Sequence, residues 1–127
     1  MQMNTQRVLI GFLAVLLAAC NQRVNQLRAF IPGTYVKSTS GEFSKATDTL
    51  LITLVSDNQY RIERHTAYRL IRDGKELPEM HHREVLGAAF DEQRQVLVET
   101  SKGRQFTFDV DKGLLVVNGK GVYDKLR

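Results

Sequence analysis

The chain has 127 residues, of which 43% are hydrophobic and 25% are charged, a size and composition typical of one globular domain. Its 18 basic and 14 acidic residues give a formal charge of +4, and the basic residues are spread along the chain. This distribution argues against a nucleic-acid-binding surface, which needs basic residues gathered on one face. The single cysteine, Cys20, excludes an intramolecular disulfide.

The first twenty residues have the order of a secretory signal. Residues 1–7 form a short polar head with one positive charge, residues 8–17 are almost wholly apolar, and Ala18 and Ala19 are small residues directly before Cys20. The apolar run is too short for a membrane-spanning helix, which takes about 20 apolar residues. We therefore expect residues 1–19 to be a signal peptide.

The sequence Leu17-Ala18-Ala19-Cys20 resembles the lipobox of bacterial lipoproteins. The resemblance implies cleavage before Cys20 and attachment of fatty acyl chains such as palmitate to this residue, which makes the membrane a partner of the protein. Each buried methylene group contributes about 0.8 kcal/mol, so two or three acyl chains would hold the domain firmly. Residues 21–29 contain no acidic residue. In two-membrane bacteria this implies the periplasmic face of the outer membrane, with the inner membrane as the alternative.

Residues 20–32 are expected to form a short lipidated tether. Val24, Leu27 and Ile31 have rough helical spacing, which predicts one or two helical turns, and Pro32-Gly33 ends them. The remaining residues, 33–127, are expected to form the folded domain.

The domain shows period-two alternation of apolar residues, interrupted by turn residues. The strand between residues 50 and 55 is apolar on both faces, and the Asp73-Gly74 pair predicts a tight hairpin. Eight strands are predicted, at residues 34–37, 50–55, 60–70, 85–90, 96–100, 105–110, 114–117 and 122–126. This spacing indicates an all-β antiparallel meander, rolled or closed into a small lipocalin-like barrel. An open sheet or a two-layer sandwich is the alternative.

Gly33-Thr34-Tyr35 in the first strand and Tyr123 in the last are similar to features of small lipocalin-like barrel lipoproteins of Gram-negative bacteria. This resemblance implies a non-enzymatic cell-envelope protein that binds a small apolar ligand or an envelope protein partner. The alternative function is an inhibitor or accessory subunit of a periplasmic enzyme or envelope assembly, comparable to periplasmic lysozyme inhibitors. The chain lacks the additional cysteines and the Ser-Gly segment of those inhibitors.

One charged stripe is a candidate binding face. Arg61, Glu63, His65 and Arg69 alternate with inward-pointing residues of the strand at 60–70. Such a stripe is either an ordinary solvated face with cross-strand ion pairs or a face that meets an anionic ligand or partner, because arginine presents forked donors.

Metal binding and catalysis have weaker support. His81 and His82 are the best metal candidates, but adjacent strand residues point to opposite faces and the usual ligand spacings are absent. Four glutamates, at positions 63, 79, 84 and 99, could supply a carboxylate pair, yet no spacing selects two of them. We therefore expect no metal, no cofactor and no catalytic residues.

Overall fold

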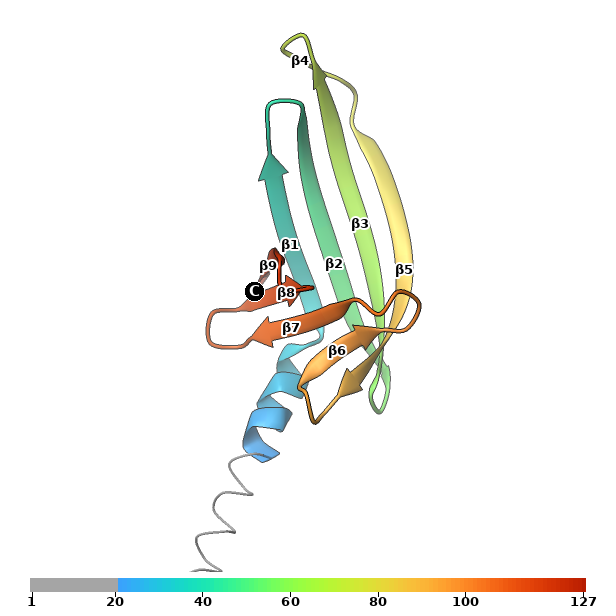
Figure 1. Ribbon diagram of the computed structural model, residues 1–127, viewed down its shortest axis with the longest axis vertical. Helices are drawn as coiled ribbons and strands as arrows, with labels where there is room; N and C mark the ends of the chain where they lie inside the picture. Colours follow the sequence, from blue (N-terminus) through green and yellow to red (C-terminus); the bar gives the residue numbers. More distant parts are fainter. Residues whose placement is uncertain (1–20) are drawn as a thin grey trace, which may run out of the picture.

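The computed structural model describes residues 21–127, which form a helix over residues 21–30 followed by nine β-strands (Figure 1). The strands are β1 (Gly33–Ser40), β2 (Ser44–Ser56), β3 (Gln59–Arg72), β4 (Lys75–Glu76), β5 (Met80–Asp91), β6 (Val96–Glu99), β7 (Gln105–Asp109), β8 (Leu114–Val117) and β9 (Gly121–Lys125).

Eight of these strands form a closed antiparallel barrel. Each strand pairs with the next along the chain, with β3 pairing with β5, and β9 returns to pair with β1. The short β4 pairs only with the end of β3 among the described residues. The predicted all-β meander and its closure are confirmed, and the open sheet and the sandwich are ruled out.

The wall of the barrel has very different heights on its two sides (Figure 1). β1, β2, β3 and β5 have 8 to 14 residues, whereas β6 to β9 have 4 or 5. The long strands therefore continue beyond the short ones as a four-stranded sheet, and we call this part the open end. The N-terminal helix lies at the opposite end, which we call the helix end.

Two tight hairpins have the turn residues that their backbone requires. Asp73 and Gly74 have φ angles of 52° and 74°, and Asn118 and Gly119 have φ angles of 51° and 70°. Two successive positive φ angles are typical of the type I′ turn that matches the twist of a hairpin. The hairpin predicted at Asp73-Gly74 is confirmed.

Alternate side chains of each strand fill the barrel. Leu50 and Ile52 of β2 point inward and are buried, whereas Leu51 and Val55 are 41% and 64% exposed. The strand that is apolar on both faces therefore has only one buried face. The barrel core consists of Tyr35, Leu50, Ile52, Tyr60, Ile62, Leu86, Ala88, Phe90, Leu97, Phe106, Leu115 and Tyr123.

The helix closes one end of this core. Its Leu27 and the following Ile31 are buried and belong to the same hydrophobic cluster as the barrel interior. The Tyr35 hydroxyl donates hydrogen bonds to the carbonyl oxygens of Phe30 and Ile31 at 3.0 and 2.8 Å, and the Lys125 ammonium also donates to that of Phe30. These donors satisfy carbonyl groups that the end of a helix leaves without partners. The segment expected to be a tether thus also contributes to the core.

No helix within residues 21–127 has the length and apolar character needed to span a membrane.

Candidate functional site

The charged stripe predicted on β3 lies on the outer face of the barrel and consists of two separate clusters. In the first, the Glu63 carboxylate lies 2.7 Å from the Arg61 guanidinium and accepts from Arg83 of β5 at 3.2 Å, and the His65 imidazole lies 3.7 Å from it. Desolvation would raise the pKa of Glu63, but Arg61 and Arg83 together outweigh it and lower the pKa. The stripe therefore has the cross-strand ion pairs of a solvated face.

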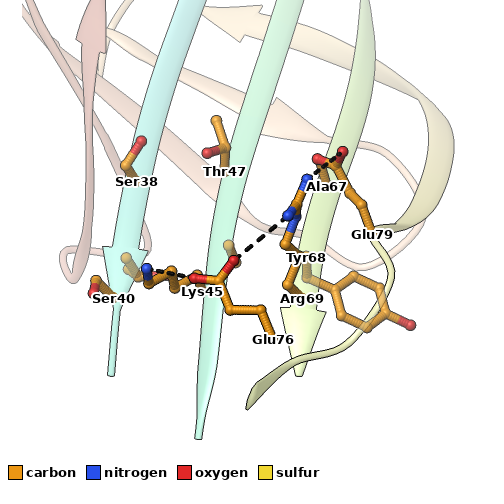
Figure 2. Close-up of a pocket in the computed structure, with 11 residues that line it drawn as sticks. Ser38, Ser40, Lys45, Thr47, Ala67, Tyr68, Arg69, Glu76 and Glu79 are labelled. Carbon is orange, nitrogen blue, oxygen red and sulfur yellow. Dashed lines mark hydrogen bonds and ion pairs between the residues drawn. The ribbon is translucent and has the colours of Figure 1, made fainter. Parts of the chain in front are cut away.

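Arg69 lies apart from the other three residues, in a hollow of about 350 Å³ at the open end (Figure 2). Its guanidinium lies 3.5 Å from Glu76 and 3.6 Å from Glu79, and Glu76 also accepts from Lys45 at 2.6 Å. Figure 2 shows both carboxylates reaching toward Arg69, with Lys45 on the neighbouring strand. The structure thus brings Arg61, Glu63 and His65 together but not Arg69.

A second group of charged residues, not predicted from the sequence, points into the barrel. Asp48 of β2 is only 8% exposed, and the other polar side chains of this group surround its carboxylate. Arg64 of β3 donates to both carboxylate oxygens of Asp48 through Nε and Nη2, at 2.8 to 3.0 Å. The hydroxyls of Thr66 and Tyr123 donate to the same carboxylate at 3.1 and 2.6 Å.

The network continues across the barrel where β6 ends and β7 begins. Arg64 lies 3.9 Å from Glu84, and Arg104 lies 3.4 Å from the same carboxylate. Arg104 also pairs with Glu99, a fully buried carboxylate that accepts from the hydroxyl of Ser101. We call Asp48, Arg64, Glu84, Glu99, Arg104 and Tyr123 the inner network.

Burial and hydrogen bonding act in opposite directions on the carboxylates of the inner network. Burial would raise the pKa of Asp48, but the hydrogen bonds from Arg64, Tyr123 and Thr66 outweigh it and lower the pKa. The pKa of Glu99 is lowered in the same way, with burial outweighed by Arg104 and Ser101. Burial and the bond to Asp48 raise the pKa of the Tyr123 phenol. At neutral pH Asp48 and Glu99 are therefore ionised and Tyr123 is protonated.

This arrangement limits the chemistry of the inner network. A general acid at neutral pH needs a carboxyl group with a raised pKa, whereas those of Asp48 and Glu99 are lowered. Among the described residues, no buried polar side-chain atom lacks a hydrogen-bond partner. The side chains of the network thus satisfy one another.

A cavity of about 70 Å³ lies beside the inner network, between Arg64, Arg104, Tyr123 and four apolar residues, Leu50, Leu86, Phe106 and Val117. Sites for small organic ligands usually enclose about 300 to 1,000 Å³. This cavity is therefore too small for a lipid or another ligand of that size.

Of the four glutamates considered as a carboxylate pair, Glu84 and Glu99 both contact Arg104, whereas the two candidate metal-binding histidines do not converge. His81 points outward and lies 3.9 Å from Glu79. His82, the next residue on the strand, points inward, as Glu84 does. Over residues 21–127, no three His, Cys, Asp or Glu side chains are grouped so that they could hold a metal ion. Cys20, the predicted lipidation site, and the predicted signal peptide lie outside the described residues.

The sequence contains a signal that could have identified part of the inner network. Arg64 occupies an inward position between Ile62 and Thr66, and Asp48 occupies the inward position before Leu50. A charged residue in an apolar alternation set needs an oppositely charged partner when it is buried. Their pairing depends on the register of β2 and β3, which the alternation alone does not specify.

Comparisons of the chain with protein-family models, with curated proteins and with solved structures returned no significant match.

Proposed function

We propose that this protein is a lipid-anchored cell-envelope protein whose non-enzymatic barrel binds an envelope protein partner at its open end. The observation that supports the proposal is the packed core, because the cavity beside the inner network has a volume of only about 70 Å³. The larger hollows described, of about 350 Å³ around Arg69 and about 430 Å³ beside Phe30 and residues 124–127, are lined mostly by surface residues. This favours the protein partner over the small ligand.

In the proposed arrangement the helix end faces the membrane and the open end faces away from it. Cys20 directly precedes the helix over residues 21–30, which packs against the barrel through Leu27. Acyl chains on Cys20 would hold the helix end near the membrane and direct the open end away from it (Figure 1). By its lipobox resemblance, we place the protein on the periplasmic face of the outer membrane.

The open end carries exposed apolar side chains that a protein partner could cover. Phe43, in the turn between β1 and β2, is 72% exposed, and Met80 at the start of β5 is 50% exposed. Leu70, near the end of β3, is also exposed. Apolar and aromatic groups beside charged ones are typical of protein interfaces.

The anchor is tested by growing cells with an alkyne analogue of palmitate. The full chain is expected to incorporate the label and to fractionate with membranes, whereas Cys20→Ser is expected to do neither. An unlabelled full chain, or one found at full length in the cytosol, would refute the anchor.

The binding surface is tested by a photo-reactive amino acid introduced into the anchored protein at Phe43. The matched control places it at Val122, an exposed apolar residue on the outer face of β9. We expect a discrete protein adduct from position 43 and none from position 122. Native mass spectrometry of the Cys20→Ser protein is expected to give only the masses of one or two copies of the chain, with no bound small molecule. A co-purified lipid would instead support the small-ligand function.

A further inference from the structure

The strand β5 has a free edge at the open end. It pairs with β3 from Met80 to Ala89, but with β6 only from Ala88 to Asp91, and Gly87 accepts from the backbone of Thr100. Among the residues that the structure describes, 80–86 therefore have a strand neighbour on one side only. Sheet edges of this kind expose backbone donors and acceptors that can pair with another strand.

Hydrogen bonds around β5 show which of its backbone groups face this edge. Phe90 donates to Asn58 on the β3 side, at 2.8 Å, whereas Gly87 accepts on the β6 side, at 2.9 Å. Because these directions alternate along a strand, even-numbered residues bond to β3 and odd-numbered residues face the other way. His81, Arg83 and Val85 thus present N–H and C=O groups along the edge, with no backbone partner among residues 21–127.

We propose that this edge pairs with the same edge of a second copy of the chain, antiparallel, with Arg83 on the two-fold axis. In this register Arg83 lies opposite Arg83 of the second copy, and His81 lies opposite Val85. All three residues then exchange backbone hydrogen bonds across the axis. The pairing uses residues 80–86, and it ends before the part of β5 that is paired with β6. It rests only on residues 80–86 and is independent of the lipid anchor.

The side chains on the inner face favour this register. It sets His82 opposite Glu84 and Met80 opposite Leu86, and the two-fold axis repeats both pairs. The imidazole N–H of a histidine can donate a hydrogen bond to a facing carboxylate, and apolar side chains that face each other across strands are stabilising. Moving the axis to Glu84 would set two carboxylates against each other, and moving it to His82 would set Met80 against Glu84. Of the registers with the two-fold axis at His82, Arg83 or Glu84, the one at Arg83 therefore gives the most favourable side-chain pairs.

The one like-charged pair of the register is compensated. Arg83 side chains would meet on the outer face at the axis, but each is already bound to Glu63 of its own chain at 3.2 Å. The dimer joins two four-stranded sheets into one and leaves the outer hollow around Arg69 free. The inferred partner is therefore a second copy of this chain.

Cysteine substitution in the full chain tests the register. Residues of a hydrogen-bonded antiparallel pair have Cα atoms about 5.5 Å apart, within the range of about 4.4 to 6.8 Å that a disulfide bridges. Arg83→Cys in membranes under mild oxidation is expected to give a covalent dimer on a non-reducing gel. His81→Cys alone and Val85→Cys alone are expected to give none, and the two expressed together are expected to give one. The unsubstituted chain controls for Cys20.

A change of charge provides a second measurement of the same contact. His82→Glu in the Arg83→Cys chain sets carboxylate against carboxylate twice and is expected to weaken association about tenfold, whereas the control His82→Arg keeps the dimer. His82 is exposed, so neither substitution removes a core contact. Equal yields from positions 81 and 83, no covalent dimer from Arg83→Cys, or equal yields from the two His82 variants would overturn the inference.

Discussion

Replacement of Asp48 by alanine is the most informative test of the inner network. The substitution leaves the Arg64 guanidinium without its counter-ion and the Tyr123 hydroxyl without its acceptor. Removing one partner of a buried ion pair costs about 3 to 5 kcal/mol. Arg64 is about one-third exposed and water can replace part of the lost interaction. We therefore expect Asp48→Ala to lower the free energy of unfolding by about 2 to 4 kcal/mol.

The measurement is urea denaturation at pH 7, followed by circular dichroism. The double variant Asp48→Ala/Arg64→Ala is expected to cost less than the sum of the two single substitutions, because the buried charges are removed together. The matched control is Asp124→Ala, which removes an exposed carboxylate from the outer face of β9. It is expected to change the free energy of unfolding by less than about 0.5 kcal/mol.

The pH dependence of the Asp48→Ala effect has a definite sign. The pKa of Asp48 is lower in the folded state, so the folded protein favours the ionised carboxylate. Its stabilising contribution is complete above the unfolded pKa of about 3.9. It is lost as the pH falls through the lower folded pKa. The stability difference between the natural chain and Asp48→Ala should therefore narrow below about pH 4. A cost below about 1 kcal/mol at pH 7, or a difference that stays constant down to pH 2, would refute this account.

Three further substitutions test other contacts by the same denaturation assay. Tyr123→Phe removes one hydrogen-bond donor to Asp48 and is expected to lower the free energy of unfolding by about 1 to 2 kcal/mol. An unchanged denaturation midpoint would show that water replaces the hydroxyl. Ile31→Ala opens a void where the helix meets the barrel and is expected to cost about 2 to 5 kcal/mol; no loss would mean that the helix does not pack there. Gly33→Ala is expected to cost about 1 to 3 kcal/mol, because its φ of 150° disfavours a side chain and an added Cβ would lie 2.7 Å from Lys125.

The strands could be predicted from the sequence because apolar alternation and turn residues are local features of the chain. Alternation located each barrel strand, but β2 begins at Ser44 and β5 at Met80, before the predicted starts at residues 50 and 85. Pairs such as Asp73-Gly74 marked turns between strands. The pattern missed β4, because Lys75 and Glu76 form only two residue pairs with β3. Strands with short connections lead directly to a meander.

The site could not be predicted to the same extent, because it depends on pairing between distant strands. Tyr123 reaches Asp48 across 75 residues of sequence, and this contact exists only once β9 has closed against β1. The stripe on β3 was recognisable because its members all lie at odd-numbered positions of one strand and so point to the same face. Arg69 lies six residues beyond Glu63 on the extended β3, about 20 Å away, and its contacts with Glu76 and Glu79 depend on the chain after β3.

The seam between β1 and β9 constrains how the chain can fold. Only two residue pairs join these strands, Tyr35 with Lys125 and Val36 with Asp124. The partner of β1 is therefore far away along the chain, and the barrel cannot close until β9 has been synthesised. Pairing across so long a separation is slow because of its entropic cost. Until β9 is synthesised, one edge of β1 in the nascent chain has no strand partner. Amide hydrogen exchange should find β9 among the first strands to detach from the native protein.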